Sequence, residues 1–104
     1  MKKADHETDR GQTENFQQII NVGPASESDF LVLGFDTPQQ LIGKDPWILY
    51  RKLCQKTETL HDPCVLDVLM ASIDYMNGNP PQQWWKYTAE RKERYSAKLE
   101  AFRV

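Results

Sequence analysis

The sequence predicts an all-α protein of five to six short helices, the last of them at the C-terminus, and three observations support this fold class. Apolar residues recur at spacings of three and four, which places them on one face of a helix. Several segments open with a capping residue followed by proline and close with glycine or asparagine, the usual boundaries of helices. No segment shows the strict alternation of a half-buried strand, so we expect helices alone.

The length of the chain predicts its domain organisation. A chain of 104 residues suffices for one domain with a modest core, and we assign that domain to residues 13–104. Residues 1–12 are polar and contain no periodic apolar positions, so they are expected to form a flexible tail. No internal repeat is sustained along the chain.

The first two helices are expected to meet at a short turn in the stretch INVGPASESDF. Thr13 suits the N-cap of the first helix, and Asn21 suits the left-handed position that ends it. Gly23 and Pro24 suit the N-cap and the first position of the second helix, which runs to Gly34. The sequence therefore predicts a helical hairpin around Asn21.

Three more helices are predicted to start where a capping residue precedes proline, at Thr37, Asp45 and Asp62. Gln40 completes a capping box with Thr37. Thr88 is the expected cap of the last helix, which follows an extended Pro-Pro connection. The helix after Asp62 is the most apolar and is expected to form the centre of the core. Its apolar positions are Val65, Leu66, Leu69, Ile73 and Met76.

The charge distribution is uneven. The whole chain has a formal net charge of −2 and is not drawn as a body to polyanions. Residues 1–36 and 57–85 each have a net charge of −4, whereas residues 44–56 and 86–104 each have +3. These two basic segments would form a positive face only if folding brings them together.

The composition predicts a cytoplasmic protein without a membrane partner. No apolar run approaches the roughly 20 residues that cross a bilayer. The N-terminal stretch MKKADHETDRGQ has no apolar segment after its lysines, so it does not have the pattern of a signal peptide. The chain has two cysteines, which we expect to be reduced thiols.

The turn and several later segments resemble known families. A short turn with an apolar residue before a glycine is similar to the helix-hairpin-helix motif. The segments NVGPA, LGF, DPWILYRKLC, HDPCVLDVLMASIDYMNG and WWKYTAERK resemble a family of small bacterial proteins named for a pathogenicity locus, some of them labelled as mitomycin-resistance-related. The resemblance covers about residues 16–95. The layout more distantly resembles the C-terminal domain of the competence regulator TfoX. The resemblance implies a compact helix-hairpin-helix (SAM-like) domain.

That fold implies binding to the DNA backbone without sequence specificity, because the N–H groups at the start of the second helix point at a phosphate. Glu27 and Asp29 oppose this, since acids in the first turns occupy the field that a phosphate would use. The alternative is a protein-interaction module, an adaptor or a self-associating chain, that binds no nucleic acid. The nucleic-acid-binding residues predicted by the first hypothesis are Asn21, Val22, Gly23, Ala25, Ser26, Lys44, Arg51, Lys52 and Lys56.

Two further groups of residues were weighed for chemistry. Cys54, His61 and Cys64 include metal-capable side chains, but their spacing matches no common zinc pattern, and we expect buried structural thiols. A nucleophilic Cys64 would need a lowered thiol pKa at its helix start, and no oxyanion-hole motif accompanies it. We therefore predict no enzyme activity and no cofactor or metal. The aromatic residues Trp84, Trp85 and Tyr87 either stack on bases and partners or pin the last helix to the core.

Overall fold

The computed structural model describes residues 10–104, and every regular element within them is helical, which confirms the all-α prediction. These residues form four α-helices and three short 3-10 helices, labelled η. The elements are η1 (Phe16–Gln18), α2 (Pro24–Val32), η2 (Pro38–Leu41), α3 (Pro46–Thr57), α4 (Cys64–Met76), η3 (Trp84–Tyr87) and α5 (Thr88–Ala101).

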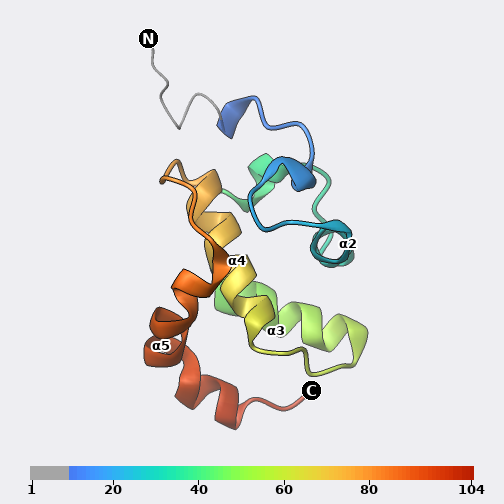
Figure 1. Cartoon of the computed structure of the whole chain (residues 1–104). Helices are drawn as coiled ribbons and strands as arrows, with labels where there is room; N and C mark the ends of the chain where they lie inside the picture. Colours follow the sequence, from blue (N-terminus) through green and yellow to red (C-terminus); the bar gives the residue numbers. More distant parts are fainter. Residues whose placement is uncertain (1–9) are drawn as a thin grey trace.

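Helix α4 lies at the centre of the molecule, as its apolar stripe predicts. It packs against α3, η2, η3 and α5, and Figure 1 shows α2 on one side of it and α5 on the other. Leu66, Leu69, Ile73 and Met76 are buried, whereas Val65 is only partly buried at the margin of the core.

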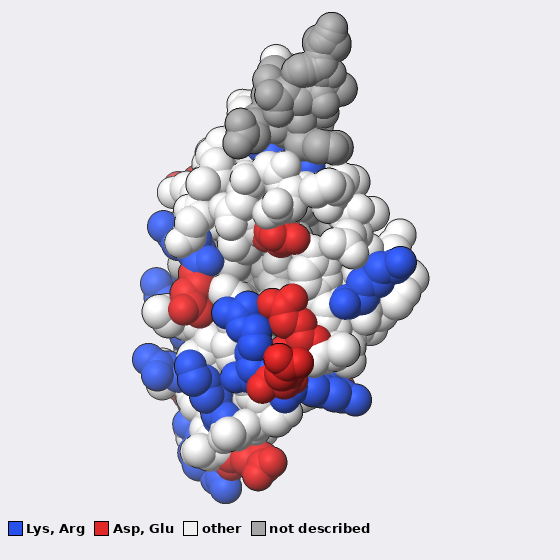
Figure 2. All heavy atoms as spheres, turned by 90° about the vertical axis from the view of Figure 1, so that its left-hand side faces the viewer, with Lys and Arg blue, Asp and Glu red and all other residues white. Residues whose placement is uncertain are grey.

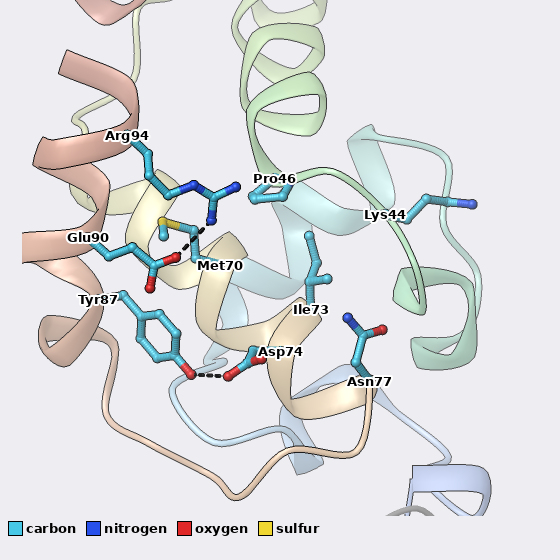
Figure 3. Close-up of a pocket in the computed structure, with 9 residues that line it drawn as sticks. All are labelled: Lys44, Pro46, Met70, Ile73, Asp74, Asn77, Tyr87, Glu90 and Arg94. Carbon is cyan, nitrogen blue, oxygen red and sulfur yellow. Dashed lines mark hydrogen bonds and ion pairs between the residues drawn. The ribbon is translucent and has the colours of Figure 1, made fainter.

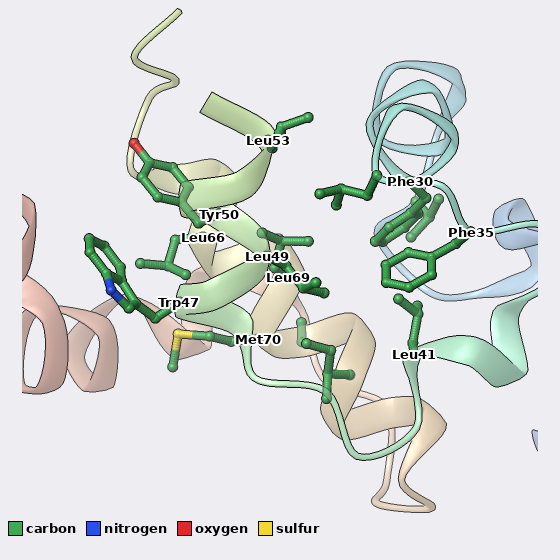
Figure 4. Packing of buried hydrophobic residues seen from close by; sticks show 14 of the residues in the cluster. Phe30, Phe35, Leu41, Trp47, Leu49, Tyr50, Leu53, Leu66, Leu69 and Met70 are labelled. Carbon is green, nitrogen blue, oxygen red and sulfur yellow. The ribbon is translucent and has the colours of Figure 1, made fainter. Parts of the chain in front are cut away.

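Aromatic side chains fill the core at both of its ends. Phe16 and Phe30 stack with their ring centroids 4.9 Å apart, which fastens η1 to α2. At the other end Trp47 packs against Tyr95 and, edge-on, against Phe102, at 5.9 and 5.8 Å. Figure 4 shows these two ends separated by the leucines of α3 and α4. The α2 side and the α5 side are thus attached to the centre by different residues.

The chain contains an internal repeat that the sequence analysis missed. Residues 15–24 (NFQQIINVGP) and 37–46 (TPQQLIGKDP) build the same unit: a short 3-10 helix, a turn and the start of an α-helix with proline at its first position. Asn21 and Gly43 occupy equivalent places in the two turns, with φ angles of 78° and 76°. We call residues 15–32 the first hairpin and residues 37–57 the second hairpin.

Three expected helix starts differ from the structure. Helix α4 is capped by Pro63 rather than Asp62, although the Asp62 carboxylate accepts from the Cys64 N–H at 2.8 Å. The first short helix is capped by Asn15 rather than Thr13, because the side chain of Gln18 reaches back and accepts the Asn15 N–H at 2.9 Å. Thr88 is the first residue of α5 rather than its cap. Its hydroxyl donates instead to the buried carboxylate of Asp67, at 2.7 Å.

A buried ion pair attaches α5 to α4. Asp67 has no exposed surface, and its carboxylate accepts from the Arg91 guanidinium at 2.8 Å. Removing one partner of such a pair costs about 3–5 kcal/mol, since the other charge is left buried. The position of the basic helix α5 is therefore fixed by this contact.

The predicted tail falls mostly on residues 1–9, which lie outside the described residues. Arg10 is buried, and its guanidinium lies over the Tyr75 ring, 3.5 Å from the centroid. The same guanidinium donates to the carbonyl oxygen of Asn79 at 2.7 Å. Arg10 thus joins the start of the described chain to the end of α4.

Candidate nucleic-acid interface

The turn of the first hairpin has the backbone that the sequence predicts. Asn21 has the left-handed conformation, and the Val22 N–H closes the turn on the Ile19 carbonyl at 3.1 Å. Gly23 is the N-cap of α2, in an extended conformation with φ of −104°. Asn21, Val22, Gly23, Ala25 and Ser26 therefore lie together at one helix start.

No side chain caps the N-terminus of α2. The first helical bond there runs from the Glu27 N–H to the Gly23 carbonyl at 2.9 Å. The N–H groups of Ala25 and Ser26 precede that bond, and Pro24 has no N–H to offer. A β-carbon added to Gly23 would meet no atom within 4 Å, so the approach to this helix start is open.

The two acids that oppose phosphate binding are both engaged by neighbouring groups. Glu27 accepts a hydrogen bond from the Gln17 side-chain amide at 2.9 Å. Burial raises the pKa of Asp29, and the nearby His61 acts in the opposite direction. Asp29 lines an apolar cleft of about 180 Å³ between α2 and α4. The remaining lining residues are Ala25, Ser26, Phe30, Cys64, Val65, Val68 and Leu69.

The N–H groups at the N-terminus of α3, the helix of the second hairpin, have partners within the protein. The Asp45 carboxylate accepts from the N–H groups of Trp47 and Ile48, at 2.9 and 3.4 Å. The Gly43 N–H donates to the side-chain oxygen of Asn77 at 2.9 Å. The donors that a phosphate would need at this helix start are thus bound within the protein.

A polar hollow of about 220 Å³ lies beside the second turn, between α3, α4 and α5 (Figure 3). Its two carboxylates are engaged: Asp74 accepts from the Tyr87 hydroxyl at 2.6 Å and Glu90 from Arg94 at 2.7 Å. Burial, and then the hydrogen bond to Asp74, raises the pKa of Tyr87. Two acids in the hollow disfavour a phosphate at this turn.

The four predicted basic residues lie at separate places. Lys56 donates to the Val32 carbonyl at 3.3 Å, at the C-terminal end of α2, and Lys52 lies one turn before it on α3. Arg51 lies with Lys98 in an open depression beside Trp47 and Phe102. Lys44 lines the polar hollow. The structure therefore places the predicted residues of the first hairpin together, but it does not bring the four basic residues to them.

The basic C-terminal helix does not reach the first hairpin. Helix α5 packs on α4 and η3, on the side of the molecule opposite α2 (Figure 1). Arg91 is paired with Asp67, and Arg94 is paired with Glu90. Figure 2, viewed from the α5 side, shows basic and acidic side chains mixed on that face. The basic residues of α5 thus add no positive patch to the first hairpin.

The cysteine and histidine side chains have structural contacts. Cys54 is buried as expected, whereas Cys64 is only partly buried. The Cys54 sulfur accepts the backbone N–H of His61 at 3.5 Å, while the His61 ring lies 2.9 Å from the Thr57 hydroxyl. Burial and the Asp62 carboxylate raise the pKa of Cys64, opposite to the shift that a nucleophile needs. Among residues 10–104 no three His, Cys, Asp or Glu side chains gather in a metal-binding arrangement.

Sequence reasoning missed one contact of the hairpin. The Asn21 side-chain amide donates to the carbonyl oxygen of Gln82 at 2.9 Å, which joins the turn to the segment that leads into η3. These residues are 61 positions apart, and no local sequence pattern predicts the contact. The Gln-Gln-apolar-Ile signature shared by the two hairpins could have revealed their equivalence.

Comparisons with known proteins place the chain among its relatives. A family model described as pathogenicity locus (Cdd1) matches residues 9–93. A mitomycin resistance protein, McrB, of Streptomyces lavendulae is 36% identical over 74 residues, covering 71% of this chain and 70% of that protein. No solved structure matches the chain. Within the described part, no helix has the length and apolar character needed to span a membrane.

Proposed function

The chain belongs to the pathogenicity-locus family, and we propose that it binds the nucleic-acid backbone, without sequence specificity, through its first hairpin. The observation that carries this proposal is the uncapped N-terminus of α2, where no side chain takes up the first N–H groups. Such a helix start attracts anions through its free N–H groups and the positive end of the helix dipole.

Gly23 supports the proposal because the protein itself does not require glycine there. Its φ of −104° is open to any residue, and an added β-carbon would meet no atom within 4 Å. The missing side chain therefore serves only the approach from outside, which the backbone of a nucleic acid needs. Contacts of this kind position a protein on phosphates without reading bases.

The scattered cations make the proposed binding weak. Few phosphates would be neutralised, so the salt dependence should correspond to one or two contacts, with a slope of roughly 0.7–0.9 per phosphate in a plot of log K against log salt. Lys56 is bound at the C-terminal end of α2, away from the proposed site at its N-terminus, and Lys52 lies one turn before it on α3.

Gly23→Asp tests the proposal, because it gives the first hairpin the cap that Asp45 gives the second. We expect at least a tenfold loss of affinity in fluorescence anisotropy with labelled DNA at low salt. Ser28→Asp is the matched control, since it adds the same charge at an exposed position of α2 beyond the first turn. Equal losses in both variants would mean that charge alone matters, and would contradict phosphate binding at the helix start.

A protein-interaction module is the second candidate. Leu31 and Val32 are exposed, by 56% and 37%, at the C-terminal end of α2. An apolar surface of this kind fits a partner protein or a second copy of the chain. Sedimentation velocity of the wild-type chain and of Leu31→Ser tests self-association. A concentration-dependent dimer that Leu31→Ser abolishes, together with no binding to DNA, would favour this candidate over the first.

A further inference from the structure

The first hairpin lies next to an aromatic segment of the chain. The hydrogen bond from Asn21 to the Gln82 carbonyl holds the turn against the connection between α4 and η3. Trp85 follows Gln82 by three residues, so their Cα atoms are at most about 11 Å apart. The hairpin turn at Asn21 therefore lies next to the segment that leads into η3.

The structure separates the three aromatic residues of η3 by their role. Tyr87 is buried, with its hydroxyl bound to Asp74, and Trp84 is half-buried and packed on the core. Trp85 is 55% exposed, and its ring stands edge-on to Trp84 with the centroids 5.8 Å apart. Trp84 and Tyr87 thus anchor the segment, while Trp85 presents its ring to solvent.

The position of Trp85 is fixed before any ligand arrives. Element η3 packs against both α4 and α5, and the Lys86 N–H donates to the Gln83 carbonyl at 3.0 Å. The other tryptophans of the chain are buried or half-buried, so the exposure of Trp85 is not general to this residue type. The neighbouring Lys86 is exposed and adds a positive charge beside the ring.

We propose that the preferred ligand is single-stranded nucleic acid, with a phosphate at the first hairpin and a neighbouring unpaired base stacked on Trp85. This inference rests on the proposed function and names the substrate class of that site. A fixed aromatic ring beside backbone contacts is the arrangement by which proteins hold single strands without sequence preference. In a duplex the base faces are covered by their neighbours, so a duplex could use the phosphate contacts alone.

A polyanion with aromatic bases fits this surface better than a protein partner does. Gln82, Lys86 and Ala89 lie near Trp85 in the chain, and all three are exposed and none is a large apolar side chain, while the half-buried Trp84 packs against one edge of its ring. A protein-binding hot spot would instead be surrounded by side chains that exclude water. The charge of Lys86 and the free N–H groups of α2 both favour phosphate.

The test uses the full chain and three labelled ligands of equal length: a single strand, a duplex, and a single strand of abasic sites that keeps its phosphates. Wild type, Trp85→Ala and Leu60→Ala are compared by fluorescence anisotropy at low salt. Leu60 is 59% exposed in the connection between α3 and α4, so Leu60→Ala is a matched loss of an exposed apolar side chain. Far-UV circular dichroism checks that the variants fold.

We expect wild type to prefer the single strand, and Trp85→Ala to weaken that binding by roughly 5- to 100-fold, the range for one base on one aromatic ring. Leu60→Ala should bind like wild type. The abasic strand should bind wild type and Trp85→Ala equally. Trp85→Phe should retain part of the affinity for the intact strand.

Two other outcomes would overturn the inference while leaving the proposed function in place. One is equal binding of single strand and duplex by wild type. The other is an unchanged affinity of Trp85→Ala for the intact strand. If none of the three ligands binds even at low salt, the proposed function fails, and the inference fails with it.

Discussion

The two hairpins have the same backbone but differ in what their helix starts offer to a ligand. Each has a short 3-10 helix, a left-handed residue in the turn and a proline at the first helical position. In the second hairpin Asp45 occupies the N–H groups of its helix. In the first hairpin Gly23 stands at that position and no side chain takes its place.

If the proposed function holds, a single capping position decides whether the unit serves stability or binding. A carboxylate at the N-cap supplies what a phosphate would supply, a negative group at the free N–H groups of the helix. The N–H groups at the helix start of the second hairpin are therefore bound by the hairpin's own side chain. The first hairpin lacks this stabilising cap, so an external anion could bind the N–H groups at its helix start.

The largest effect is expected at the left-handed position of the turns. Gly43→Val should lower the free energy of unfolding by about 1–2 kcal/mol, because a β-branched residue is strained at φ of 76°. Gly43→Asn should cost less, since the equivalent Asn21 tolerates this conformation. Urea unfolding followed by circular dichroism measures both. Equal losses would show that the two turns are not equivalent.

Removing the cap of the second hairpin comes next. Asp45→Ala should lower the free energy of unfolding by about 1 kcal/mol, the usual cost of losing a helix N-cap. It should not create a second binding site, because Asp74 and Glu90 line the hollow beside that turn. Urea unfolding measures the change in the free energy of unfolding, and fluorescence anisotropy with labelled DNA measures the affinity. A gain in DNA affinity would contradict this view of the second hairpin.

The smallest effect concerns the acid behind the first hairpin. Burial raises the pKa of Asp29, so its ionised form opposes folding once the pH exceeds the unfolded value of 3.8. Asp29→Asn should therefore be more stable than wild type at neutral pH, and this advantage should disappear as the pH falls below that value. Thermal unfolding at several pH values measures it, with the exposed Asp36→Asn as control. A constant difference across pH would exclude this explanation.

Local chemistry was predictable from the sequence. Asp45 and Thr37 have the capping roles that their positions before proline indicate, since capping depends only on residues within one turn. The central place of α4 followed from its apolar stripe. The capping of the first short helix was misjudged because Thr13 and Asn15 both suit an N-cap, and the reach of Gln18 decides between them.

The long-range arrangement could not be predicted. Whether the basic segments share a face depends on where α5 lies, and the pairing of Asp67 with Arg91 fixes that. Nothing in the spacing of these two residues identifies them as partners. The repeat was missed because only four of the ten aligned positions are identical and the N-caps differ. The backbone conformation of the turn was thus predicted correctly, but the distribution of charge around it was not.

The hydrogen bond between Asn21 and Gln82 has a consequence for affinity. It joins the hairpin turn to the segment that leads into η3, so under the proposal above a strand bound at the turn would be held near Trp85. The second contact is then intramolecular, with an effective concentration set by the protein rather than by the solution. Two contacts that are each weak can in this way act as a bivalent clamp on a protein whose net charge is −2.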